Sequence, residues 1–195
     1  MPDKSKGRGP FLLVLSLTIA RLPLAVVFGV LLHALEPGPL RMWIGLGILV
    51  LIELTDLLDG LLARRLNTVT EMGATLDPYA DSVARLIIFW SLALAGLTLW
   101  IVPLVMAVRD VTVAYSRITM ARHGRSVAAR WSGKVKAVVQ GLCAFLLVAG
   151  PLYEGWTGIW PRQALSWTVA VVTAASAVEY VRGALEAARS SERAI

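Results

Sequence analysis

Residues 56–81, DLLDGLLARRLNTVTEMGATLDPYAD, place four aspartates in or beside segments that are otherwise apolar enough to lie in a membrane. Asp56 and Asp59 close one apolar run, and Asp77 and Asp81 open the next. Residues three or four apart share a helix face, so each pair projects from one side of its helix. Because only a short connection separates the two runs, we expect antiparallel neighbouring helices with all four carboxylates at one membrane depth.

Apolar runs continue on both sides of this stretch along the 195-residue chain, which is 57% hydrophobic and 16% charged, with a mean hydropathy of +0.69. A run of about 20 apolar residues can cross a ~30 Å hydrocarbon core. The composition therefore predicts an all-α, polytopic membrane protein with six transmembrane helices in a single domain, residues 1–195. The hydropathy argues against the alternative, a water-soluble helical core. The predicted spans are Phe11–Leu35, Met42–Leu66, Pro78–Leu99, Ile101–Arg122, Lys134–Tyr153 and Gln163–Ala188.

The net charge of +6 is distributed as in a membrane protein rather than as in a nucleic-acid-binding surface. With the N-terminus placed in the cytoplasm, only Arg41 and Arg162 among the basic residues fall on the far side of the predicted spans. This asymmetry follows the positive-inside rule. It predicts a multi-pass protein of the cytoplasmic membrane, in contact with the lipid bilayer, with no nucleic-acid partner. Both termini and the aspartate site are predicted to face the cytoplasm.

Four neighbouring carboxylates repel one another, so they require a compensating positive charge to stay ionised together. Mg²⁺ and Mn²⁺ favour carboxylate oxygens, and four such ligands suit a site for two divalent cations. Sites with two metals typically clamp phosphate groups during transfer reactions. The alternative is that the acids cap helices or reach the membrane interface. That interpretation fits a single aspartate such as Asp77, which precedes Pro78, better than two facing pairs.

Small and basic residues between the aspartates suit a phosphate ligand. Gly60 and Ala63 lie on or near the face of the first pair and leave room for a ligand to approach the backbone. Arg64 offers two parallel donors to a phosphate, and Gly73 allows the chain to turn back. Tight helix packing would explain the glycine and the alanine if each stood alone.

The spacing Asp56-x2-Asp59-Gly60-x2-Ala63-Arg64-x8-Gly73-x3-Asp77-x3-Asp81 resembles, without a gap, the signature of the CDP-alcohol phosphotransferase (phosphatidyltransferase) family. Members of this family transfer a substituted phosphoryl group from a CDP-linked donor to an alcohol and release CMP. The resemblance implies two divalent cations, Mg²⁺ or Mn²⁺, held by the four aspartates, with Asp81 also acting as the general base. It further implies a set of nucleotide-binding residues: Thr18, Asp56, Gly60, Ala63, Arg64 and Gly73.

The basic second half, RDVTVAYSRITMARHGRSVAARWSGKVKAVVQG (residues 109–141), must select the acceptor. Arg109 and Arg117 are about two turns apart and lie roughly on one helix face. A basic residue inside a membrane helix is costly unless it meets an anion, and Asp110 is the simpler partner for Arg109. The order of an Arg–acidic pair, a second Arg, and GKxK followed by Gln resembles that of phosphatidylglycerophosphate synthases. This resemblance implies CDP-diacylglycerol as donor and sn-glycerol 3-phosphate as acceptor, with the acceptor phosphate on Arg109, Arg117, Lys134 and Lys136.

Two positions depart from the pattern: Leu15 stands where an asparagine is frequent, and Ala137 stands where a threonine is frequent. Inositol phosphate, or phosphatidylglycerol as in cardiolipin synthesis, is the alternative acceptor within the family. A cation or proton transporter is the alternative from a different class. A transporter needs access from both membrane faces, whereas these acids cluster at one. The family resemblance also implies a homodimer.

Overall fold

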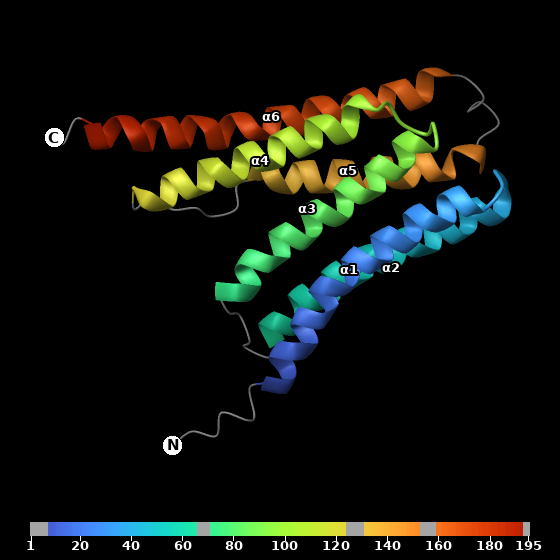
Figure 1. The fold of residues 1–195 in the computed structure, drawn as a ribbon, viewed down its shortest axis with the longest axis horizontal. Coiled ribbons are helices and arrows are strands. Elements are labelled where there is room, and N and C mark those ends of the chain that lie inside the picture. Colours follow the sequence, from blue (N-terminus) through green and yellow to red (C-terminus); the bar gives the residue numbers. More distant parts are fainter. Residues whose placement is uncertain (1–7, 66–70, 124–130, 153–158, 193–195) are drawn as a thin grey trace. The chain divides into compact units, whose positions relative to one another are not determined.

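The computed structural model describes residues 8–65, 71–123, 131–152 and 159–192. Side chains are described in these ranges except at residues 8–18, 59–60, 62–64, 71–77, 151 and 191–192. The described residues form six α-helices and one short 3-10 helix, and no β-strand occurs among them (Figure 1). The prediction of an all-α protein is confirmed.

The helices fall into two compact units, each of which is described by itself. The first unit, Met1–Ala95, contains α1 (Arg8–Ala34), α2 (Pro39–Arg65) and α3 (Glu71–Leu94). The second unit, Gly96–Ile195, contains α4 (Ile101–Arg122), α5 (Trp131–Ala149), η1 (Gly150–Leu152) and α6 (Ile159–Glu192). A single domain over residues 1–195 stays a prediction.

In the first unit, α1 packs against both α2 and α3. Ala25 and Phe28 of α1 are almost fully buried, as is Phe89 of α3. The two helices α1 and α3 approach closely at Gly29, where a Cβ atom would lie 2.5 Å from the Ser91 side-chain oxygen. A glycine on α1 therefore lets α3 approach closely, which is a common way to pack membrane helices.

In the second unit, α6 packs against both α4 and α5 (Figure 1). The start of α4 is fixed to α6 by a 2.8 Å hydrogen bond between the hydroxyls of Thr98 and Ser166. Gly96 has a φ of +71°, a left-handed conformation that only glycine adopts without strain, and it ends the turn after α3. Further along the unit, Gln140 Nε2 of α5 donates to the Thr173 hydroxyl of α6 at 2.9 Å.

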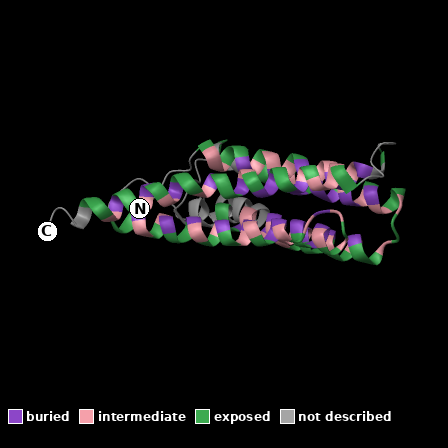
Figure 2. Ribbon diagram, turned by 90° about the horizontal axis from the view of Figure 1, so that it is seen from above, coloured by how far each residue is buried: buried purple, intermediate pink, exposed green. Residues whose placement is uncertain are grey.

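Exposed positions occur on every helix (Figure 2), and large apolar residues are among them. Examples, one from each helix in chain order, are Val30, Leu51, Trp90, Val108, Val138 and Val171. Such outward apolar surface suits a lipid environment better than water. By length and apolar composition, two helices can cross a membrane: α5 (Trp131–Ala149) and the segment Ile159–Ser190 of α6.

The helix ends differ most from the predicted span in α3, and by four residues or fewer in the other helices. The predicted span Ile101–Arg122 has the same bounds as α4. By contrast, α3 begins at Glu71, not at Pro78, which lies inside the helix. Gly73 is consequently a helical residue rather than the site of a turn, and Asp77 is not an N-cap. Membrane helices tolerate an interior proline because neighbouring groups satisfy the backbone that it frees.

Candidate active site

The first described aspartate, Asp56 of α2, is held by a buried arginine of α1. Arg21 Nη1 donates to Asp56 Oδ1 at 2.7 Å, and the Arg21 side chain is only 1% exposed, against 48% for Asp56. Thr18 lies one turn earlier in α1, but its side chain is outside the described residues. The pair therefore joins α1 to the aspartate end of α2 and leaves the carboxylate partly accessible.

The second described aspartate, Asp81 of α3, is held in the same way by Arg85 of its own helix. Arg85 Nε donates to Asp81 Oδ1 at 2.8 Å, as the spacing of four residues allows. Arg85 Nη2 also lies 3.3 Å from Glu53 Oε1 of α2. The Arg85 side chain is 10% exposed, and Asp81 is 27% exposed. One buried guanidinium thus links α2 to α3 and fixes one oxygen of Asp81.

The other motif residues are placed only by their backbone. Those in α2 and α3 are Asp59, Gly60, Ala63, Arg64, Gly73 and Asp77, and all six are helical, while their side chains lie outside the described residues. Among the described residues, no group of three or more metal-ligating side chains is present. The structure therefore describes two of the four predicted metal ligands, Asp56 and Asp81, one on each of the two expected helices.

In the second unit, Arg109 lies in a network of polar side chains between α4 and α6. Its Nε donates to Ser176 Oγ at 2.9 Å, and its Nη1 donates to Asp110 Oδ1 at 2.8 Å. The Ser176 hydroxyl in turn donates to the Thr173 carbonyl at 2.7 Å. The simpler partner considered for Arg109, its neighbour Asp110, is therefore present.

Arg117 and Arg109 meet at a single aromatic ring, that of Tyr180 in α6. The guanidinium carbons lie 5.3 Å and 5.7 Å, respectively, from the ring centroid. Arg117 Nη2 also donates to the Tyr180 hydroxyl at 3.4 Å. Tyr180 is 2% exposed, so these contacts are shielded from solvent. The expectation that the two arginines share a face of α4 agrees with their contacts to this ring.

The two lysines of α5 differ in their surroundings. Lys136 is 5% exposed, and its Nζ lies 3.4 Å from Asp110 Oδ1, so one carboxylate is shared by Lys136 and Arg109. Lys134 is exposed and makes no ion pair with any residue that the structure describes. Of the four predicted acceptor-binding residues, the structure brings three together and leaves Lys134 outside the cluster.

One buried donor of the two arginines has no hydrogen-bond partner within the described ranges. Arg117 Nε is buried without an acceptor among them, whereas Arg109 donates through its Nε and Nη1 to Ser176 and Asp110. Buried polar groups are normally paired, because leaving one unpaired costs about 1–3 kcal/mol. Arg109 and Lys136, which share the Asp110 carboxylate, and Arg117, which meets Arg109 at the Tyr180 ring, therefore form a cationic cluster that suits an oxyanion such as a phosphate.

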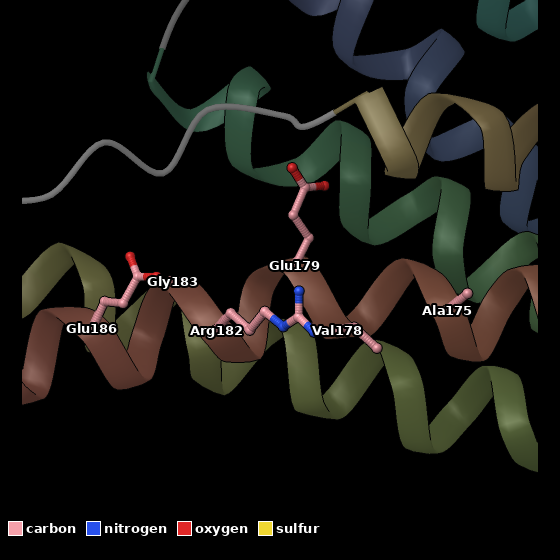
Figure 3. Close-up of a pocket in the computed structure, with 6 residues that line it drawn as sticks. All are labelled: Ala175, Val178, Glu179, Arg182, Gly183 and Glu186. Carbon is pink, nitrogen blue, oxygen red and sulfur yellow. The ribbon is translucent and has the colours of Figure 1, made fainter.

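A surface depression lies on one face of α6, next to the cluster along the helix. Figure 3 shows its lining residues, which come from successive turns: Ala175, Val178, Glu179, Arg182, Gly183 and Glu186. The Glu179 carboxylate stands out from the helix and accepts a hydrogen bond from the Ser132 hydroxyl at the start of α5. With two carboxylates and one guanidinium, the depression has mixed charge and does not share the cationic character of the cluster.

Sequence reasoning missed Arg85, Glu53 and Tyr180. Arg85 follows Asp81 by four residues, and Glu53 precedes Asp56 by three, so helical spacing would have placed both near the motif. No local signal identifies Tyr180, because its partners lie 63 and 71 residues away in α4. Only the packing of α4 on α6 brings them together.

The fold and the aspartate motif define the class of protein. The chain matches the sequence model of the CDP-alcohol phosphatidyltransferase family over residues 12–178, and it belongs to this family. Members of the family generally depend on divalent cations.

The chain is also similar to individual proteins whose names are more specific than that of the family. The chain is 38% identical over 136 residues to the CDP-diacylglycerol–glycerol-3-phosphate 3-phosphatidyltransferase of Escherichia coli K12, covering 67% of this chain and 72% of the relative. The enzyme of the same name from Salmonella choleraesuis is 37% identical over 137 residues, with coverage of 67% and 72%. A probable phosphatidylglycerophosphate synthase of Mycobacterium tuberculosis is 33% identical over 135 residues, which is 68% of this chain. The match spans 61% of the length of that mycobacterial relative.

Proposed function

We propose that this protein transfers the phosphatidyl group of CDP-diacylglycerol to the hydroxyl of sn-glycerol 3-phosphate, giving phosphatidylglycerophosphate and CMP. Family membership and the names of its relatives support the reaction class. The observation that carries the choice of acceptor is the cluster of three cations, Arg109, Arg117 and Lys136, in which the buried Nε of Arg117 has no acceptor among the described residues. An unphosphorylated alcohol offers no anionic oxygen to this cluster, whereas a phosphate does.

In the proposed reaction, Asp81 is the general base. Its carboxylate takes the proton from the acceptor hydroxyl while the hydroxyl oxygen forms a bond to the phosphatidyl phosphorus. The bond between that phosphorus and the CMP oxygen breaks, and CMP leaves with the bonding electron pair. Arg85 Nε contacts Asp81 through Oδ1, at 2.8 Å, and not through Oδ2. The Asp81 side chain is partly exposed. This geometry supports a carboxylate that is both held in place and accessible.

Asp56, Asp59, Asp77 and Asp81 would hold two divalent cations, Mg²⁺ or Mn²⁺. Hard carboxylate oxygens are the ligands that these cations prefer, and the two described carboxylates are partly exposed, which fits such a role. When bound, the cations would neutralise the diphosphate and the charge that develops on the leaving CMP. Arg21 Nη1 donates to Oδ1 of Asp56, and Arg85 Nε donates to Oδ1 of Asp81.

The nucleotide of the donor would lie along Thr18, Asp56, Gly60, Ala63, Arg64 and Gly73, with Arg64 on a phosphate. The helical backbone of α2 supports this arrangement for Gly60, Ala63 and Arg64, because residues three and four apart lie on neighbouring positions of one face. The acceptor phosphate would lie on Arg109, Arg117 and Lys136, and Lys134 would contribute from the exposed side of α5.

The proposed enzyme acts as one membrane domain over residues 1–195. Its six helices would span the cytoplasmic membrane, with both termini and the active site facing the cytoplasm and with two chains forming a homodimer. The basic residues at the predicted cytoplasmic ends and the apolar exterior of the helices support this topology. Labelling of single cysteines from either side of a vesicle, in a Cys143→Ala background, would test it.

A panel of acceptors with purified enzyme, CDP-diacylglycerol and Mg²⁺ or Mn²⁺ tests the proposal directly. We expect CMP release with glycerol 3-phosphate and much slower release with inositol phosphate, inositol, serine or phosphatidylglycerol. Faster release with inositol phosphate or phosphatidylglycerol would replace the proposed acceptor by that alternative. Cation flux through sealed proteoliposomes without CMP release from any acceptor would favour the transporter alternative.

A further inference from the structure

We propose that Tyr180 is a positioning residue for the acceptor phosphate: it holds Arg109 and Arg117 as a preformed pair of guanidinium groups. The inference rests on the proposed function for the identity of the natural ligand. The geometry that supports it lies entirely within the second unit.

The ring of Tyr180 contacts both arginines. The two guanidinium carbons lie 5.7 Å and 5.3 Å from its centroid, within the range of about 6 Å over which a cation is attracted to an aromatic face. Two guanidinium groups on one ring repel each other, and the negative face of the ring offsets part of this repulsion. Tyr180 therefore stabilises the close placement of Arg109 and Arg117, which the acceptor phosphate would otherwise have to bring together.

The hydroxyl of Tyr180 adds a directional contact. It accepts a hydrogen bond from Arg117 Nη2 at 3.4 Å, and a Cβ atom at Gly133 of α5 would lie 3.5 Å from it. Arg117 thus has one nitrogen occupied by the tyrosine, while its buried Nε keeps no acceptor among the described residues. The contact orients the guanidinium and leaves an edge for an anion.

Arg109 is oriented by a second set of contacts that also involves α6. Its Nε is bonded to Ser176, one turn before Tyr180, and its Nη1 to Asp110. The Arg109 guanidinium carbon also lies over the Tyr180 ring, 5.7 Å from its centroid, so Arg109 contacts α6 both through Ser176 and through this ring. Holding a binding group in its bound geometry increases affinity because less conformational freedom is lost when the ligand binds.

The test uses the full-length protein in detergent and compares wild type with Tyr180→Phe and Tyr180→Leu. Tyr180→Phe removes the hydroxyl contact and keeps the ring, whereas Tyr180→Leu removes both. Binding of glycerol 3-phosphate and of inorganic phosphate is measured by isothermal titration calorimetry, which does not depend on turnover. We expect binding to weaken about two- to tenfold in the phenylalanine variant and about tenfold or more in the leucine variant.

Tyr115→Phe is the matched control, because it makes the same chemical change at an exposed tyrosine of α4. Its binding constants are expected to equal those of the wild type. KM for CDP-diacylglycerol and the melting temperature are measured for all variants. A role in positioning predicts a rise in KM for glycerol 3-phosphate with KM for the donor unchanged.

Equal phosphate binding by the wild type, Tyr180→Phe and Tyr180→Leu would overturn the inference. A rise in KM for CDP-diacylglycerol that parallels the rise for glycerol 3-phosphate would also overturn it. So would a wild type that binds neither glycerol 3-phosphate nor inorganic phosphate. If the wild type binds glycerol 3-phosphate but releases no CMP with it, the proposed function fails. Even then, binding that weakens from wild type to Tyr180→Phe to Tyr180→Leu would support the positioning role of Tyr180, and equal binding would contradict it. If the leucine variant does not fold, the phenylalanine variant and its control provide the decision.

Discussion

Arg85 Nε and Asp81 Oδ1 lie 2.8 Å apart on successive turns of α3, and the same guanidinium reaches Glu53 of α2 at 3.3 Å. A buried arginine thus connects the last aspartate of the family motif to the helix that carries the first two. The buried position of Arg85 matters, because an ion pair shielded from water is sensitive to the loss of either partner.

The first prediction concerns Arg85. Arg85→Met should lower kcat for CMP release by about 10- to 100-fold, since a hydrogen bond to a charged group contributes about 1.5–3 kcal/mol. Arg85→Lys should retain more activity, because it keeps the charge but not the Nε geometry. Steady-state assays with glycerol 3-phosphate measure both. Glu53→Gln serves as a milder comparison, because the Glu53 contact is longer and its side chain is 40% exposed; a larger effect from Glu53→Gln than from Arg85→Met would contradict this ranking.

The second prediction concerns the aspartates. Asp81→Asn should lower turnover by about 100-fold or more, because general-base catalysis typically contributes 10²–10⁴-fold. Electron paramagnetic resonance of bound Mn²⁺ should show two ions in the wild type and weaker binding in Asp81→Asn and Asp56→Asn. Glu36→Gln, an exposed acid between α1 and α2, is the control and should change neither quantity. Full turnover by Asp81→Asn would end the assignment of Asp81 as the base.

Chelation provides the third prediction. Treatment with EDTA should abolish CMP release, and excess Mg²⁺ or Mn²⁺ should restore it, because the four proposed ligand carboxylates would need a positive counter-charge to bind a diphosphate. The restored rate should rise with metal concentration in the wild type. Unchanged activity after chelation, with metal content checked by elemental analysis, would contradict a metal-dependent reaction.

The sequence predicted the elements of this fold better than their contacts. Apolar runs identified all six helices, and the bounds of α4 were predicted to the residue, because Gly96 and the polar stretch after Arg122 mark its surroundings. The start of α3 was predicted seven residues late, because Pro78 resembles a first-turn proline. Local patterns do not reveal that this proline lies inside a helix rather than at its start.

In the candidate site, too, the sequence predicted individual residues but not the contacts between helices. The aspartates were predicted from spacing alone, and Arg109, Arg117 and Lys136 from their order along the chain. The structure brings those three cations together. Tyr180 and the Arg21–Asp56 pair depend on how helices pack, and the pair joins residues 35 positions apart. Tertiary contacts at such separations have no counterpart in helical periodicity.

The fourth prediction concerns the close approach of α1 and α3. Gly29→Leu should lower stability by about 1–3 kcal/mol, the usual cost of overpacking, since even a Cβ atom there would lie 2.5 Å from Ser91 Oγ. Gly47→Leu in α2 is the matched control, because nothing lies within 4 Å of a Cβ at that position. Thermal unfolding in detergent should separate the two variants. Equal melting temperatures would show that α1 and α3 are not in the described contact.

The last prediction separates the two lysines of α5. They share a residue type and a helix and lie two positions apart, but Lys136 is buried beside Asp110 while Lys134 is exposed. If the cluster binds the acceptor phosphate, Lys136→Met should raise KM for glycerol 3-phosphate about tenfold or more, the size expected for one charge-assisted hydrogen bond. Lys134→Met should change it about twofold or less, since exposed charges interact weakly through solvent. The donor KM should stay constant in both. The reverse ranking would move the phosphate to the exposed side of α5, and equal effects would mean that burial does not determine which lysine binds it.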